Sequence, residues 1–211
     1  MNAIFCLYNR SIIGIDNKLP SLAIDGLNKT RAAKADMSMF KHITKEATVV
    51  MGRKTWESMG SKPLPGRKMN LVITSDPQAM SKKQPIWKFK DPVNFVTKEQ
   101  FEKYYMNEPN VWVIGGVQLL KEYLPLCEQI YVNELHCQDE FNLNGFDSSR
   151  CTYFHWEELY DILKENDFID KDRPAWSTMA TDCIAPRDKV TLYCYHFFKY
   201  YLNDWEEPKH D

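Results

Sequence analysis

The sequence predicts an α/β fold, in which helices cover both faces of a central, mostly parallel sheet. Three observations favour this class. Apolar runs alternate with segments of helical period along the 211 residues. The helical segments lie between successive apolar runs, as crossover connections do in parallel sheets. Motifs rich in glycine, threonine and charge follow those runs, at the carboxyl ends of strands where such sheets bind ligands.

Each element is predicted from its local pattern, a short apolar run for a strand and a longer periodic segment for a helix. The chain length suits one domain with a sizeable core. The expected strands are Ala3 to Tyr8, Ala47 to Met51, Met69 to Thr74, Val93 to Val96, Val111 to Ile114, Gln129 to Leu135 and Val190 to Lys199, the last of which closes the sheet. The expected helices are Ala35 to Thr44, Arg53 to Met59, Lys98 to Met106, Val117 to Tyr123 and Trp156 to Glu165.

Composition argues against several classes of protein. The 27 basic and 29 acidic residues nearly balance and the basic ones are scattered, so we expect no nucleic-acid partner. Asn9 and Arg10 break the N-terminal apolar run, which is too short for a signal peptide or a membrane span, so we expect a cytoplasmic protein. The six cysteines form no CxxC pair and the five histidines no HExxH motif, which predicts reduced thiols and no metal site.

The most informative stretch is VVMGRKTWESMGSKPLPGR, from Val49 to Arg67. Its apolar start predicts a buried strand, Gly52 a sharp turn, and the following RKT the start of a helix with free backbone N–H groups, where a phosphate would bind. The PLPGR segment then predicts a rigid loop that ends in an arginine, whose planar fork matches a carboxylate. This order suits a phosphorylated cofactor held beside an anionic substrate.

This stretch resembles the core signature of the dihydrofolate reductase family, and other segments match in the order found in that family. IIGIDNKLP (Ile12 to Pro20) resembles the loop that closes over nicotinamide, and ADMSMFK (Ala35 to Lys41) resembles the helix that bears the acid. VIGG (Val113 to Gly116) resembles the diglycine turn under the pyrophosphate, and LYCYHFFKY (Leu192 to Tyr200) resembles the closing strand. The ordered set carries the resemblance, because GRKT and GG alone are weak signals.

The resemblance implies a dihydrofolate-reductase-like sheet with an antiparallel C-terminal strand, in a single domain over residues 1–199. Residues near 21–34 and 168–187 are then insertions, and 200–211 form a polar tail. It also implies NADPH-dependent reduction of 7,8-dihydrofolate, with or without a polyglutamate tail, to tetrahydrofolate, in support of one-carbon and thymidylate metabolism. The expected partners are therefore small molecules, with no nucleic acid and no membrane, and the protein is expected to be a monomer or a homodimer.

The resemblance also implies roles for residues of this sequence. Asp36 and Asn133 take the catalytic positions: the acid polarises the pterin during hydride transfer from nicotinamide, and Asn133 bridges the acid to the pterin. The expected substrate contacts are Ile4, Phe5, Met37, Phe40, Lys41, Met59, Leu64, Arg67 and Ile114. The expected cofactor contacts are Cys6, Ile13, Leu19, Gly52, Arg53, Lys54, Thr55, Thr74, Ser75, Gly115, Gly116, Val117, Gln118 and Leu119.

Simpler interpretations stay open for several of these residues. The apolar neighbours of Asp36 predict a buried carboxyl with a raised pKa, but Asp36 could instead be a first-turn carboxylate that favours the helix dipole. Arg53, expected to bind the adenosine 2′-phosphate with Ser75, could be a surface charge. Met59 could belong to the core. The bond between Gly115 and Gly116 is expected to be cis, as in the family, with a plain tight turn as the alternative.

Some positions depart from the family pattern, mostly around the pterin. Ser21 stands where the family normally has tryptophan, and Asn133 where it has threonine; Phe5 and Cys6 stand where it has small residues, and Val117, Gln118 and Leu120 also differ. Two alternatives to a reductase of dihydrofolate therefore stay open. One is a folate- and NADPH-binding scaffold with little turnover, and the other is a related pyrimidine reductase of riboflavin synthesis, against which LPGR and ADMSMFK argue.

The inserted segment from Ser21 to Lys34 joins the closing loop to the acid-bearing helix. We interpret it as part of a mobile lid over the pterin, with Gly26 as its hinge and an apolar face formed by Leu22, Ile24 and Leu27. A solvated surface excursion fits the sequence equally well.

Overall fold

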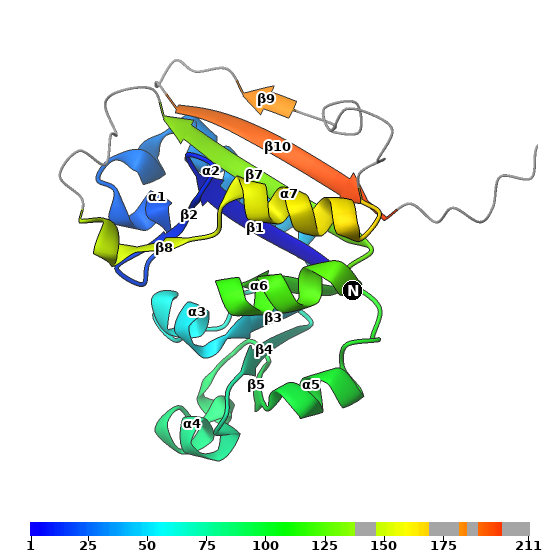
Figure 1. Cartoon of the computed structure of the whole chain (residues 1–211). Helices are drawn as coiled ribbons and strands as arrows, with labels where there is room; N and C mark the ends of the chain where they lie inside the picture. Colours follow the sequence, from blue (N-terminus) through cyan, green and yellow to red (C-terminus); the bar gives the residue numbers. More distant parts are fainter. Residues whose placement is uncertain (138–146, 169–181, 185–189, 200–211) are drawn as a thin grey trace, which may run out of the picture.

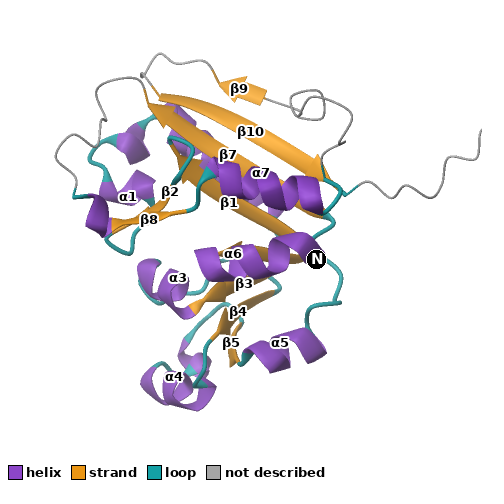
Figure 2. Cartoon of the chain, viewed as in Figure 1, coloured by secondary structure: helices purple, strands orange, loops and turns teal. Residues whose placement is uncertain are grey.

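The computed structural model describes residues 1–137, 147–168, 182–184 and 190–199. Their strands form one sheet in the order β5-β4-β3-β6-β1-β7-β10-β9, with β2 paired to β1 and to β8. Figure 2 shows this sheet running through the molecule, with helices on both sides. The strands are β1 Asn2–Tyr8, β2 Ile12–Ile15, β3 Thr48–Gly52, β4 Met69–Ile73, β5 Val93–Val96, β6 Val111–Gly115, β7 Gln129–Cys137, β8 Cys151–Tyr153, β9 Asp182–Ile184 and β10 Val190–Phe198.

The prediction of a mostly parallel sheet that is closed by an antiparallel strand is confirmed. The pairs β3–β4, β3–β6, β4–β5, β1–β6 and β1–β7 are parallel, and β10 runs antiparallel to β7. Figure 1 shows β7 and β10 side by side as the two longest arrows. In this register Asn133 of β7 lies between Cys6 of β1 and Cys194 of β10, so these three side chains share one face of the sheet.

Helices cover both faces of the sheet. They are α1 Pro20–Ala23, α2 Arg31–Ile43, α3 Arg53–Ser58, α4 Pro77–Lys83, α5 Lys98–Tyr104, α6 Val117–Tyr123 and α7 Trp156–Glu165, with 3₁₀ turns at Leu27–Lys29, Ile86–Lys88, Leu124–Leu126 and Ser148–Arg150. Phe101, Leu120 and Leu159 bring α5, α6 and α7 into one apolar cluster with Phe5 and Val132. Two further clusters pack α2, α3 and α4 against the other face.

Helix α2 begins at Arg31, four residues before the predicted start at Ala35. Thr30 provides the reason, because its Oγ1 accepts a hydrogen bond from Ala33 N at 3.2 Å and caps the helix. Asp36 is therefore the sixth residue of α2, outside its first turn. The alternative interpretation of Asp36 as a first-turn carboxylate is wrong.

The segment 21–34 does not form the apolar lid that we expected. Ile24 and Leu27 are buried in a cluster with Tyr8 and Ile12, whereas Leu22 is 57% exposed. Gly26 has φ 78°, a left-handed value that suits glycine, but it precedes a 3₁₀ turn packed on the core. Because Ile24 and Leu27 belong to the core, this segment contributes to stability and is neither a separate lid nor a solvated excursion.

Several expectations concern residues outside the described part. Most of the second insertion, near 168–187, lies there, as does the tail 200–211. Phe168, at the start of this insertion, is described and is buried in the cluster with α7. Within the described residues, no helix is long and apolar enough to cross a membrane.

Candidate active site

Two clefts meet along the carboxyl ends of the parallel strands. The larger has a volume of about 750 Å³ and lies over the ends of β3, β4, β5 and β6. The smaller, of about 170 Å³, lies beside β1 and β6 and is more apolar. Their linings share Asn17, Lys54, Thr55, Gly116, Val117 and Thr152, so the clefts are continuous. The larger volume is within the range of small-molecule sites, about 300–1,000 Å³.

All of the expected cofactor residues line one cleft or the other. Those from the starts of α3 and α6 and from the end of β4 line the larger cleft: Gly52, Arg53, Lys54, Thr55, Thr74, Ser75, Gly116, Val117, Gln118 and Leu119. The remaining four line the smaller cleft: Cys6, Ile13, Leu19 and Gly115. Residues dispersed over more than a hundred positions of sequence are thus gathered at one edge of the sheet.

The diglycine turn lets β6 and α3 approach closely. The bond between Gly115 and Gly116 is cis, as expected, and Gly115 has φ 141°. A Cβ atom at Gly116 would lie 3.3 Å from Thr55 Oγ1, tighter than an ordinary contact. Glycine at this position therefore keeps the Thr55 hydroxyl and the start of α6 together in the shared part of the clefts.

Two of the basic residues that line the larger cleft, Arg53 and Lys98, are already paired. Arg53 Nη1 donates to Glu57 Oε1 at 2.8 Å and to Oε2 at 3.0 Å, one turn along α3. Lys98, at the start of α5, forms ion pairs with Glu122 and, at 3.8 Å, with Glu102. An anion that enters this cleft would compete with these carboxylates for the cations.

Asp36 is held on α2 by neighbours from two strands. It is 7% exposed, and Asn133 Nδ2 donates to its Oδ1 at 2.7 Å. Cys6, the neighbour of Asn133 on β1, shares this face of the sheet, and its Sγ donates to Leu7 O at 3.6 Å. Burial raises the pKa of Asp36, while the hydrogen bond from Asn133 and the nearby Cys6 side chain lower it in part, so the net direction is upward as predicted. Burial together with the nearby carboxylate also raises the pKa of the Cys6 thiol, which stays protonated.

The expected substrate residues fall into two groups. Most of them share one apolar cluster: Ile4, Phe40, Met59, Leu64 and Ile114. The Arg67 guanidinium lies 5.5 Å above the Phe40 ring, and its Nη1 donates to Pro65 O at 2.8 Å. Arg67 is only 7% exposed, and burial lowers the pKa of its guanidinium. Met59, left open between core and site, packs against this cluster and is partly buried.

Three expected substrate residues lie apart from that cluster. Met37 is 45% exposed and Lys41 is exposed, both on α2. The Phe5 ring packs 5.6 Å from Phe154 in the cluster that includes α7, while Phe5 also lines the smaller cleft. Because most of its surface is buried in that core, Phe5 does not fill the space beside Asp36.

The comparisons with known proteins agree with this arrangement. A sequence model described as dihydrofolate reductase matches residues 1–167. The chain belongs to the dihydrofolate reductase family. The dihydrofolate reductase of Haemophilus influenzae is 31% identical over 159 residues, which cover 74% of this chain and 83% of that protein. That of Bacillus subtilis is 31% identical over 138 residues, covering 65% of this chain and 70% of that protein.

A solved structure shares the fold of this family member. The dihydrofolate reductase from Enterococcus faecalis, complexed with NADP(H) and RAB-propyl, superposes with a TM-score of 0.55 and 24% sequence identity. The match covers 93% of this chain and 94% of that chain.

Sequence reasoning missed several residues that line the clefts in this family member. In the larger cleft they are Asn17, Ile73, Thr97, Lys98, Glu99 and Thr152. Thr97 follows β5 and caps α5 through Gln100, so its position after a parallel strand could have identified it. Thr152 lies on β8, which pairs with β2 about 140 residues away, and no local signal marks it.

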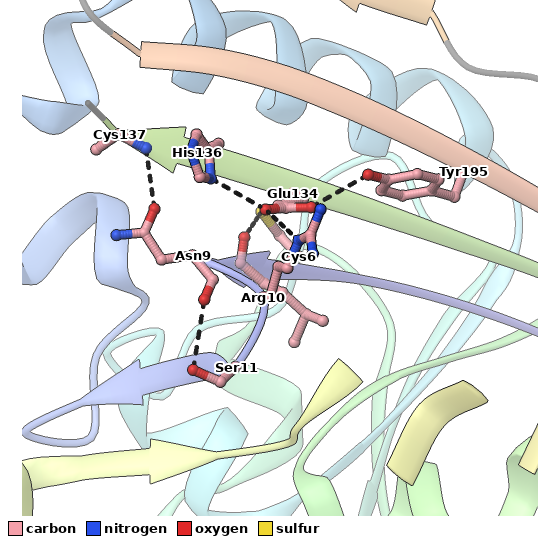
Figure 3. A network of polar contacts seen from close by, with 9 residues as sticks. Cys6, Asn9, Arg10, Ser11, Glu134, His136, Cys137 and Tyr195 are labelled. Atoms are coloured by element: carbon pink, nitrogen blue, oxygen red, sulfur yellow. Dashed lines mark hydrogen bonds and ion pairs between the residues drawn. The ribbon is translucent and has the colours of Figure 1, made fainter. Parts of the chain in front are cut away.

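A buried carboxylate, on the face of β7 opposite to Asn133, lies beside the turn at the start of the closing loop. Figure 3 shows Glu134 between Tyr195, His136 and Arg10. The Tyr195 hydroxyl donates to Glu134 Oε2 at 3.2 Å, and His136 Nδ1 and Arg10 Nε lie 3.4 and 3.9 Å from Oε1. Arg10 lies in the turn between β1 and β2, so this network joins that turn to the strand that carries Asn133.

The tip of the same loop is tied to the segment before β8. Asp16 and Arg150 form a two-pronged ion pair, and Asp16 N donates to Arg150 O at 2.9 Å. Asn17, the next residue, lines both clefts. The loop is therefore held over the junction of the clefts. No group of acidic, histidine or cysteine residues in the described part could hold a metal ion.

Proposed function

We propose that this chain catalyses the NADPH-dependent reduction of 7,8-dihydrofolate to tetrahydrofolate. The observation that carries the proposal is the junction of two unlike clefts. One has paired cations and hydroxyls suited to phosphates, and the other has Cys6 in its wall, near the buried carboxylate of Asp36. Membership of the dihydrofolate reductase family supports the same assignment.

The residues of the larger cleft fit a dinucleotide phosphate. Arg53 and Ser75 would bind the 2′-phosphate, and Lys54 and Thr55 the pyrophosphate, beside the close contact between Thr55 and Gly116. When bound, NADPH supplies the hydride for the reaction. Ile13 and Leu19 of the closing loop would shield the junction from water.

Asp36, Arg67 and three residues of one apolar cluster, Phe40, Met59 and Leu64, fit a pterin joined to an anionic tail, and none of these five residues lines either of the two clefts. The Asp36 carboxylate would accept hydrogen bonds from the amidine-like edge of the ring, polarising it so that N5 can take a proton from water. Phe40, Met59 and Leu64 would line the slot for the benzoyl group. Arg67 would pair with the glutamate α-carboxylate through its guanidinium fork.

A spectrophotometric assay with NADPH and dihydrofolate tests the proposal. Loss of NADPH absorbance, coupled to formation of tetrahydrofolate, is the expected result. Binding of NADPH without oxidation would instead support a scaffold of low turnover. Oxidation with a pyrimidine intermediate of riboflavin synthesis, but not with dihydrofolate, would support the other reductase.

Asp36→Asn tests the role of the acid within that assay. The variant should fold and bind NADPH but reduce dihydrofolate far more slowly at neutral pH, because an amide cannot carry the charge. The defect should shrink at low pH, where the substrate is already protonated. Wild-type turnover in this variant at pH 7 would show that Asp36 has only a structural role.

The proposal extends to the setting of the enzyme. We infer that it acts in the cytoplasm, because Cys6, Cys127, Cys137 and Cys151 are free cysteines, as is usual in a reducing compartment. We also infer from the balanced charge that it binds no nucleic acid, and we propose that it is a monomer or a homodimer. Sedimentation of the purified protein would measure its mass in solution.

A further inference from the structure

The turn between β1 and β2 places an arginine where glycine is the usual residue. Asn9 and Arg10 have φ values of 46° and 64°, both left-handed, and Ser11 N donates to Tyr8 O at 3.3 Å across them. Two left-handed residues in succession are typical of a type I′ hairpin turn, whose second central position favours glycine because a Cβ atom is strained there. An arginine in this conformation is therefore expected to make a compensating contact with its side chain.

That contact is with Glu134, a carboxylate whose hydrogen bonding is incomplete. Glu134 is 1% exposed, the Tyr195 hydroxyl donates to its Oε2, and its Oε1 accepts no hydrogen bond from the residues that the structure describes. Two basic groups face Oε1, Arg10 Nε at 3.9 Å and His136 Nδ1 at 3.4 Å (Figure 3). Histidine is charged only when protonated, whereas arginine always is, so Arg10 supplies the permanent counter-charge to this buried acid.

The position of Arg10 in the chain connects this pair to the clefts. Strand β2 begins two residues after Arg10, and Ile13, Asn17 and Leu19 of the closing loop line the smaller cleft. We propose that Glu134 is a positioning residue for the closing loop and acts through Arg10. Its buried charge favours the one position of the turn in which the guanidinium faces it. This inference rests on the proposed function, in which the closing loop shields the junction of the clefts around NADPH.

The backbone contacts of the turn do not account for arginine at this position. Arg10 O accepts a hydrogen bond from Trp156 N at 3.0 Å, and Ser11 O accepts one from Phe154 N at 2.7 Å, so the turn is tied to the junction of β8 and α7. Glycine could accept the same bond and would adopt the left-handed conformation without strain. Arg10→Gly therefore removes the charged side chain and keeps the turn.

The rate at which NADPH leaves the full-length protein, followed by stopped-flow tryptophan fluorescence, tests the proposal. NADPH should leave Arg10→Gly about fivefold faster than wild type, the upper end of what an ion pair with one exposed partner provides. Arg10→Lys restores a cation and should recover most of the difference. Lys45→Ala is the matched control, because the Lys45 side chain is also 71% exposed and its Nζ lies 3.8 Å from the exposed carboxylate of Glu46. It should leave the rate unchanged.

A double-mutant cycle with Glu134→Gln shows whether the two residues act together. Glutamine keeps an acceptor for the Tyr195 hydroxyl but carries no charge, so Arg10→Gly should have no further effect on the rate in the Glu134→Gln background. An unchanged rate in Arg10→Gly, or an equal effect of Arg10→Gly in both backgrounds, would overturn the proposal. If Glu134→Gln fails to fold, Arg10→Lys decides, and a rate equal to that of Arg10→Gly would overturn the proposal.

The dihydrofolate assay stays separate from this test. Turnover by the wild-type protein, with an unchanged rate of NADPH release in Arg10→Gly, refutes only the role of Glu134. Faster release from Arg10→Gly, in a protein that does not reduce dihydrofolate, refutes only the reductase assignment.

Discussion

Arg53→Ala should weaken NADPH and leave NADH nearly unchanged, because only NADPH has a 2′-phosphate. In the structure, Arg53 is paired with Glu57 at 2.8 Å, with the two side chains 47% and 41% exposed. An exposed pair one helical turn apart contributes only about 0.3–0.5 kcal/mol. A charge-assisted hydrogen bond to phosphate contributes about 1.5–3 kcal/mol, so phosphate displaces Glu57 with a net gain of about 1–2.5 kcal/mol.

This difference gives the size of the effect in each variant. Arg53→Ala should raise the dissociation constant of NADPH roughly five- to seventyfold. Glu57→Gln removes the competing charge and should lower it about twofold. Lys54→Ala serves as a control that should weaken both cofactors, since the pyrophosphate is common to them. Fluorescence titration of each variant with NADPH and with NADH measures all three effects.

Two outcomes would refute the reasoning. An equal loss of NADPH and NADH in Arg53→Ala would show that Arg53 does not bind the 2′-phosphate. Weaker NADPH binding in Glu57→Gln would show that Glu57 orients Arg53 for the phosphate and does not compete with it.

Two further predictions concern stability. Leu27→Ala should lower the free energy of unfolding by about 2–5 kcal/mol, measured in urea. Leu22→Ala, at an exposed site, should lower it by less than about 0.5 kcal/mol. Equal losses of stability in the two variants would contradict the assignment of Leu27 to the core and support the lid. His196 stacks on Tyr131 at 3.6 Å, and burial lowers its pKa from 6.5 to about 4. The unfolded chain therefore binds the extra proton first, and stability falls as pH drops from 6.5 to about 4. After allowance for partial exposure, His196→Phe should remove about 1–2 kcal/mol of that loss; parallel pH profiles for His196→Phe and wild type would refute it.

The sequence predicts this fold best where apolar runs and crossover helices coincide. The buried strands β3, β4, β5 and β6 lie within one or two residues of the predicted ranges. Strands β2 and β8 were missed, because each is short and their pairing joins residues about 140 positions apart. The start of α2 was missed because Thr30 caps Ala33 without the glutamate or glutamine of a capping box.

The sequence predicts many of the residues that line the two clefts, but not the contacts among them. Asp36 stands out because apolar residues flank it, and the glycines because they follow strands. The pairing of Arg53 with Glu57 was readable from their spacing of four. The position of Phe5, turned into the core against Phe154, depends on a strand pairing that no local pattern reveals.

The buried polar atoms of the candidate site that have no hydrogen-bond partner indicate which groups a ligand would need. Arg67 Nε and Asn133 Oδ1 are both buried, and neither has a hydrogen-bond partner in the described part of the chain. The first is a donor, the second is an acceptor, and Phe40, over whose ring Arg67 lies, shares an apolar cluster with Met59 and Leu64. The complementary molecule has a carboxylate at one end, an amino-bearing ring at the other and an apolar group between. Dihydrofolate has this order of groups, so the atoms that cost stability in the free protein are those that the proposed substrate would satisfy.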